Sequence, residues 1–208
     1  MSAIGAGSLS AALGVVALAL VPLALVTLTS FAKISVVFSA LRNALGAPDV
    51  PSAAIVGALA LALSVYVMAP VAEAVEAQSR AAREPEAIGS LLDAAREPLR
   101  GFLAAHAGEA ETALLVELGA RRATPARADD LSVLWASFAL SELKEAFELG
   151  FFVYLPFLVL DLLVGYVLLA LGVHGLSPSA VALPFKLLLF VAADGFVLVS
   201  RALLLGYA

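Results

Sequence analysis

The chain has no cysteine among its 208 residues, which excludes disulfide bonds, thiolate nucleophiles and cysteine-ligated metals. Histidine is nearly absent as well, since only His106 and His174 occur, and their spacing matches no metal-ligand motif. The sequence also lacks a Gly-x-Ser-x-Gly motif and a glycine-rich phosphate loop. These absences predict a protein that is not an enzyme and that uses no cofactor or metal.

Charged residues are scarce in this chain. They make up 14% of it, whereas apolar residues make up 62%, and a typical soluble domain has about 25% charged residues. The net charge is −5, and no basic patch is present that would indicate binding to nucleic acid. The composition therefore predicts an all-α, polytopic membrane protein in contact with membrane lipid.

The amino-terminal part of the chain is hydrophobic. Residues 2–32 carry no charge and offer no basic region or convincing cleavage site, so we expect a retained first helix rather than a signal peptide. This helix should cover about residues 9–31 with a kink at Pro22, and its helical pattern should continue over 27–46. A second hydrophobic helix is expected at about 50–71, where many small residues favour close packing in a bundle.

The rest of the chain divides into an amphipathic part and a second hydrophobic part. Residues 73–130 place charges of both signs around an apolar stripe at helical spacing, which is typical of amphipathic helices. Residues 149–207 have room for two helices of membrane-spanning length, separated by helix breakers at 172–178. The sequence thus predicts four long hydrophobic helices in two hairpins. The expected regions are the hydrophobic segment 1–72, the amphipathic segment 73–134 and the carboxy-terminal hairpin 135–208.

Loop charges give an expected orientation in the membrane. Lys33 and Arg42 outweigh Asp49 around the first connection, whereas the segment 73–134 is net negative. Because positively charged loops stay in the cytoplasm, the first loop is expected there. The middle region is then expected on the opposite, periplasmic side.

Four charged residues lie inside the carboxy-terminal hydrophobic segments, where a lone charge costs at least ~2.5 kcal/mol. They are Asp161, Lys186, Asp194 and Arg201. On one ideal helix the last three share a side, which predicts an ion-pair stripe that locks neighbouring subunits or lines a pore. The alternative for Lys186 and Arg201 is that they reach the membrane interfaces. For Asp161 we favour a structural salt bridge or a helix-cap role over a proton relay, since its own helix holds no second ionisable residue nearby.

Several sequence runs match one protein family in order along the chain. They are Ser-Glu-Leu-Lys-Glu-Ala-Phe at 141–147, Leu-Pro-Phe-Leu-Val-Leu-Asp at 155–161 and Leu-Pro-Phe-Lys at 183–186, preceded by Leu-Arg-Asn-Ala-Leu-Gly at 41–46. Together they resemble the FliP/SctR family of export-gate membrane proteins in flagellar and injectisome type III secretion. The residues that match the family motif are Glu142, Phe147, Gly150, Phe151, Pro156, Pro184, Phe185 and Lys186.

The resemblance implies a subunit of the bacterial inner membrane that acts without catalysis. Five copies would assemble with SctS-, SctT- and SctU-like partners into a conduit for unfolded export substrates. The buried charges would be paired across subunits or would face its aqueous bore. It also implies an inter-subunit contact for Glu142. The compact length is more similar to the injectisome branch. The family's methionine-rich gate run is replaced here by Val173, His174, Gly175 and Leu176, which are therefore expected to form the gate loop.

Two other classes remain open at this point. A small ion channel or secondary transporter also has intramembrane charges and proline-broken helices, but that class predicts paired repeats, and no internal repeat is apparent in the sequence. A purely structural membrane scaffold would need no constricted pore.

Overall fold

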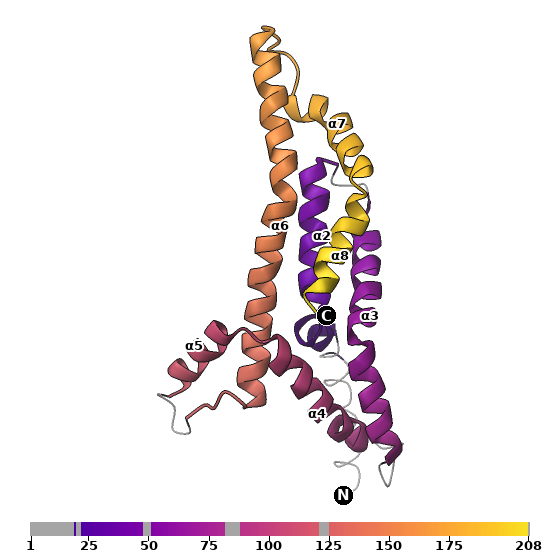
Figure 1. Cartoon of the computed structure of the whole chain (residues 1–208), viewed down its shortest axis with the longest axis vertical. Coiled ribbons are helices and arrows are strands. Elements are labelled where there is room, and N and C mark those ends of the chain that lie inside the picture. Colours follow the sequence, from indigo (N-terminus) through magenta and orange to yellow (C-terminus); the bar gives the residue numbers. More distant parts are fainter. Residues whose placement is uncertain (1–18, 20–21, 48–50, 82–87, 121–124, 208) are drawn as a thin grey trace, which may run out of the picture.

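The computed structural model describes residues 19, 22–47, 51–81, 88–120 and 125–207, and every regular element within these residues is helical. A short helix at Pro22–Leu28 is followed by seven labelled helices (Figure 1). These are α2 (Phe31–Leu45), α3 (Ala53–Ala81), α4 (Ile88–His106), α5 (Glu109–Gly119), α6 (Leu131–Ala170), α7 (Pro178–Ala192) and α8 (Gly195–Leu205).

Helix α6 is the axis of the molecule. Its 40 residues correspond to a length of about 60 Å. Helices α2, α3 and α8 lie along one side of it, α7 returns from its far tip, and α4 and α5 spread out at its amino-terminal end (Figure 1). The tip of the hairpin formed by α6 and α7 therefore extends beyond the other helices.

Helix α2 lies at the centre of the main hydrophobic core. Apolar residues recur on it at helical spacing, and Ile34, Val37, Phe38 and Leu41 are all at most 3% exposed. They pack against residues of α3, α6, α7 and α8 in one cluster. A second cluster joins α4 to the start of α6, where the rings of Phe102 and Phe138 lie 5.6 Å apart between centroids. The first cluster packs α2 and α8 against α6, and the second packs α4 against it.

The expected continuous helix across residues 27–46 is wrong, because the chain bends sharply at Thr29. The helix at Pro22–Leu28 and α2 meet at an angle of 82°. The hydroxyls of Thr27 and Thr29 donate to the carbonyls of Leu23 and Leu25 at 2.8 and 2.5 Å. Such back-bonding by Ser and Thr often bends a helix. The first part of the expected helix at 9–31 lies mostly outside the described residues.

The hydrophobic helices differ in their bounds from the four that were expected. In the described part of the chain, α3 and α6 are each long and apolar enough to cross a membrane, and up to four spans result if each bent helix pair is counted as one. Helix α3 continues past residue 72, and α6 begins before residue 135. The regions drawn from composition at 1–72, 73–134 and 135–208 are therefore joined by continuous helices.

The last expected helix is broken into α7 and α8, which meet at an angle of 60°. Asp194 lies at the break in the left-handed conformation, with φ of 49°, and the buried Gly195 begins α8 directly afterwards. A Cβ atom on Gly195 would lie 2.1 Å from the ring of Phe190, which is itself buried in the main core. The break thus depends on a glycine at this position.

Replacing Gly195 by alanine is expected to destabilise the chain by about 1–3 kcal/mol, because the Phe190 ring must leave its packed position. Thermal unfolding of the purified chain in detergent measures this. Gly57→Ala is the matched control, since a Cβ there meets nothing within 4 Å and alanine favours a helix interior by about 0.5–1 kcal/mol. Equal melting temperatures for the two variants would contradict the packing argument.

Candidate functional site

Two of the four charges expected inside the membrane meet in one buried ion pair. Lys186 of α7 donates from Nζ to Oδ2 of Asp161 on α6 at 2.6 Å, and also to the carbonyl of Ala44 at 3.0 Å. The Lys186 side chain is 3% exposed, and that of Asp161 is 23% exposed. Ala44 belongs to the last turn of α2, where carbonyls lack helical partners and the helix dipole favours a cation. Lys186 therefore ties the interiors of α6 and α7 to the carboxy-terminal end of α2.

Asp194 and Arg201 do not join this pair. The projection that put them on one side with Lys186 is wrong, because the helix breaks at Asp194 and the direction of the axis changes. Both side chains are exposed, and neither forms a salt bridge with a described residue. Asp161 was expected to form a structural salt bridge or a helix cap, and it forms a salt bridge with Lys186 of the same chain. The buried charges were expected to pair across subunits or to face the bore.

A second buried ion pair lies nearer the amino-terminal end of α6 and was missed by sequence reasoning. Lys33 of α2 lies 3.2 Å from Oε1 of Glu142 and 2.5 Å from Oε2 of Glu145. The side chains of Lys33 and Glu142 are only 2% and 3% exposed, whereas Glu145 is 48% exposed. Glu142 was expected to contact another subunit. In the structure its ion-pair partner, Lys33, belongs to the same chain.

The carboxy-terminal Tyr207 completes this second cluster. Its hydroxyl donates to Oε2 of Glu142, and its ring lies 4.4 Å from Nζ of Lys33, which is cation–π distance. Burial raises the pKa of the Tyr207 phenol far above its ordinary value, and the neighbouring Glu142 carboxylate raises it further. Tyr207 is therefore a neutral donor. His106 lies against it, with ring centroids 5.3 Å apart.

The signal that could have revealed this cluster is the position of Lys33. It is the single charge in an apolar helical pattern that runs from Leu28 to Leu41, and it was assigned to a loop boundary. A lone charge on the apolar stripe of a helix needs a buried partner. The sequence therefore indicates that Lys33 has a counter-charge. It does not indicate that this counter-charge is Glu142, which is 109 positions away.

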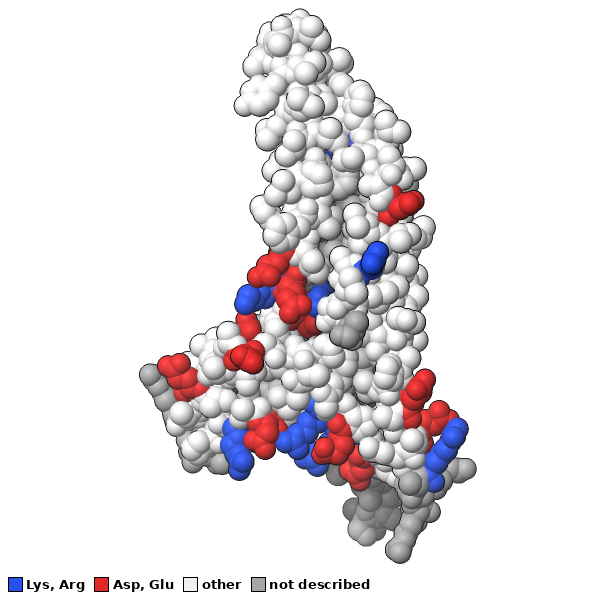
Figure 2. Space-filling view, in the orientation of Figure 1, with Lys and Arg blue, Asp and Glu red and all other residues white. Residues whose placement is uncertain are grey.

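Charge is distributed unevenly over the outer surface. Figure 2 shows acidic and basic side chains gathered over the half of the molecule that contains α4, α5 and the start of α6, whereas the tip of the α6–α7 hairpin is almost free of them. Exposed ion pairs in the charged half include Lys144 with Glu111 at 3.2 Å. A hydrogen bond to the backbone and the adjacent Lys144 lower the pKa of the Glu111 carboxyl. The charged half suits water, and the other half suits an apolar surrounding.

A model of the FliP family matches residues 15–203, which is nearly the whole chain. The chain belongs to the FliP family. It is 43% identical over 205 residues to the hypersensitivity response secretion protein HrcR of Ralstonia nicotianae, covering 92% of this chain and 94% of that protein. It is 40% identical over 200 residues to the Yop proteins translocation protein R of Yersinia pestis, covering 91% and 92%.

A flagellar relative is also similar. The flagellar biosynthetic protein FliP of Pectobacterium carotovorum is 39% identical over 194 residues, which cover 89% of this chain and 73% of that protein. The relatives are components of type III secretion and flagellar export systems. The family predicted from the sequence motifs is therefore confirmed.

The FliP motif residues lie in two kinds of surroundings. Glu142 and Lys186 are buried in the ion pairs described above, and Gly150 is buried where a Cβ would lie 3.2 Å from Ala40 of α2. Phe147, Phe151 and Phe185 instead expose between 53% and 66% of their surface. The prolines lie inside helices, Pro156 in α6 and Pro184 in α7. The motif thus combines internal packing with an exposed apolar surface.

The residues expected to form the gate loop lie at the tip of the α6–α7 hairpin (Figure 1). Val173, His174, Gly175 and Leu176 are all exposed, and Gly172 just before them has a positive φ of 70° that suits glycine. Among the described residues no cluster of three or more metal-binding side chains occurs. In this FliP family member the loop is an exposed turn between α6 and α7, and two of its four residues, Val173 and Leu176, are apolar.

Proposed function

We propose that the chain is a core subunit of a type III export gate. Five copies, together with SctS-, SctT- and SctU-like partners, would surround a conduit through which unfolded substrates cross the bacterial inner membrane. The family membership and the names of the relatives support the secretion role. The middle region, residues 73–134, would face the periplasm.

The observation that carries this proposal is the apolar surface of the α6–α7 hairpin. Only 11% of an apolar stretch of 18 residues in α6 is buried within the chain. Large side chains such as Phe151, Phe152 and Leu162 are more than half exposed. Contiguous exposed apolar surface of this kind marks an interaction with protein or membrane. Copies of the same hairpin and partner helices would cover it in the assembly.

The two buried ion pairs support the same proposal. Because Lys33 and Lys186 are neutralised by Glu142 and Asp161 within the chain, the hairpin can pack against other copies without burying unpaired charge. Each subunit would therefore enter the assembly already folded. The loop Val173–Leu176 would then line the constriction of the conduit, closed by Val and Leu side chains in place of methionine.

Assembly tests this proposal. The chain is co-expressed with its SctS- and SctT-like partners, and native mass spectrometry of the purified complex is expected to show five copies. Phe151→Gln should reduce assembly about tenfold or more, since a buried aromatic anchor contributes about 2 kcal/mol or more to an interface. A chain that stays monomeric in the presence of both partners would contradict the proposal.

The matched control is Leu92→Gln. Leu92 is 67% exposed and Phe151 is 61% exposed, but Leu92 lies on α4, away from the hairpin. Neither substitution removes a buried side chain, so both variants should remain folded as single chains. If Leu92→Gln reduced assembly as much as Phe151→Gln, the hairpin would not be the main contact surface.

A further inference from the structure

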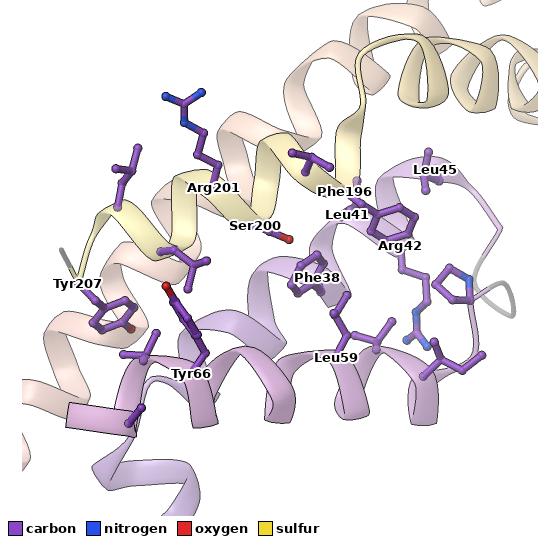
Figure 3. Close-up of a pocket in the computed structure, with 18 of the residues that line it drawn as sticks. Phe38, Leu41, Arg42, Leu45, Leu59, Tyr66, Phe196, Ser200, Arg201 and Tyr207 are labelled. Atoms are coloured by element: carbon purple, nitrogen blue, oxygen red, sulfur yellow. The ribbon is translucent and has the colours of Figure 1, made fainter. Parts of the chain in front are cut away.

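A large groove opens between α2, α3 and α8, with a volume of about 1080 Å³ (Figure 3). It follows α3 from Pro51 to Pro70, and almost all of its lining is apolar. The large side chains in the lining include Phe38, Leu41, Leu45, Ile55, Leu59 and Phe196. A groove of this size and character matches the sites that bind small apolar ligands in proteins.

Two charged residues line this groove, the exposed Arg201 and the less exposed Arg42. Arg42 extends from α2 toward the start of α3 at one end of the groove (Figure 3). Its Nε atom is buried and has no hydrogen-bond partner among the described residues, and its guanidinium forms no salt bridge with any of them. By contrast, Lys33, Lys144 and Lys186 are all paired with carboxylates. Arg42 therefore presents unsatisfied donors and a positive charge to whatever fills the groove.

The position of Arg42 relative to the membrane follows from α3. Residues 53–72 of this helix are uncharged, and 20 helical residues span about 30 Å, the thickness of the hydrocarbon layer. The start of α3 thus lies at one boundary of this layer. Arg42 lines the groove together with Pro51 and Ile55 at that boundary, which is the level of lipid headgroups.

The groove suits a lipid better than another helix. Helices pack closely in membranes through small residues, and the small exposed residues Ala54, Ala58 and Ala62 of α3 lie outside the groove lining. The groove itself is lined by bulky side chains that leave irregular space between them. A hydrocarbon chain can follow such a surface, and α3 keeps a separate face for partner helices.

We propose that this groove binds one anionic phospholipid, with its phosphate on the Arg42 guanidinium and an acyl chain along α3. Arginine binds phosphate through paired, charge-assisted hydrogen bonds, and basic pockets between transmembrane helices bind anionic headgroups. The ligand satisfies the buried Nε and covers the apolar lining at once. This inference does not depend on the export function, since it concerns a single chain.

Lipid retention tests the proposal. The purified full-length chain in detergent is mixed with phosphatidylglycerol or with phosphatidylcholine of the same acyl chains, and bound lipid is counted by native mass spectrometry. The chain is expected to retain one phosphatidylglycerol in preference to phosphatidylcholine. Arg42→Gln should reduce the affinity for phosphatidylglycerol about fivefold, which is the effect of one basic charge near a membrane surface.

Arg127→Gln is the matched control for charge, since Arg127 is 78% exposed and lies outside the groove lining. Arg201 is not a suitable control because it borders the groove, although its guanidinium points away from Phe38 and Tyr66 (Figure 3). The Arg127→Gln variant should bind phosphatidylglycerol as the natural chain does. Ser200→Leu places bulk in the groove without changing charge, and it should lower the retention of both lipids.

Three results would overturn the proposal. The first is equal phosphatidylglycerol binding by Arg42→Gln and the natural chain. The second is an equal loss in Asp49→Asn, because it would assign the effect of Arg42 to a protein contact with this carboxylate, which lies outside the described residues. The third is loss of the lipid when copies of the chain assemble, which would make the groove a contact between subunits.

Discussion

Replacing Lys33 by methionine is expected to destabilise the folded chain by about 3–5 kcal/mol, the cost of leaving one member of a buried ion pair alone. Glu142 is 3% exposed, so water cannot solvate its carboxylate once Lys33 is gone. Tyr207 would still donate one hydrogen bond to Glu142, but it brings no positive charge. The free energy of unfolding in detergent micelles, measured with increasing denaturant, gives the size of the effect.

A neighbouring pair with an exposed lysine provides the control for this prediction. Lys144 and Glu111 are also 3.2 Å apart, but their side chains are 58% and 16% exposed. Because exposed ion pairs contribute about 0–1 kcal/mol, Lys144→Met should change stability by no more than that. The two variants make the same chemical change in pairs of equal distance, but Lys33 is buried and also contacts Glu145 and Tyr207. Equal costs would show that the Lys33 pair is not needed for folding.

A double variant separates charge from packing. Lys33→Met combined with Glu142→Gln removes both charges and keeps the volume of each side chain. It should recover much of the stability lost in Lys33→Met, because the stability changes caused by substitutions within one network do not add. No recovery would mean that Lys33 acts through its hydrocarbon stem or through Glu145 instead. Glu145→Gln alone should cost little, since that carboxylate is half exposed.

Local sequence was sufficient to predict the family and the helical class, and it predicted two of the hydrophobic helices in part. Helix α3 follows from a run of uncharged residues of membrane-spanning length, and α6 follows in part from the apolar residues after Leu149. The extension of α6 back to Leu131 was not predicted, because the first helix of the carboxy-terminal hairpin was expected within residues 149–207. Helical hydrogen bonds form within the backbone, so a change from charged to apolar side chains does not end a helix.

The charges were harder to predict because their partners are far apart in sequence. Lys33 and Glu142 are 109 positions apart, and Lys186 and Asp161 are 25 apart on different helices. Spacing on an ideal helix can relate residues only within one straight helix. It failed at Asp194, where one residue in the left-handed conformation redirects the chain. The gate loop, Val173–Leu176, was located from the family motif, and its role stays a prediction.

Replacing Lys186 by methionine is expected to have an effect of similar size, at least ~3 kcal/mol, because it removes two interactions at once. Asp161 loses its counter-charge, and the carbonyl of Ala44 loses a donor at the end of α2. Asp161→Asn should cost less, since an amide oxygen can still accept from Lys186 and Asp161 is the more exposed partner. Unfolding in detergent micelles measures both variants, and an equal or larger cost for Asp161→Asn would contradict this order.

A charge swap distinguishes a simple ion pair from the three-helix contact. If Lys186 acted only through Asp161, the double variant Asp161→Lys with Lys186→Glu would restore the attraction and most of the stability. Position 186, however, also faces the Ala44 carbonyl and the negative end of the α2 dipole. A carboxylate there would be repelled by both, so the swap should remain as unstable as Lys186→Met. Recovery in the swap would mean that the contact with α2 contributes nothing. Failure to recover would mean that Lys186 holds the α6–α7 hairpin against α2 through its donors as much as through its charge.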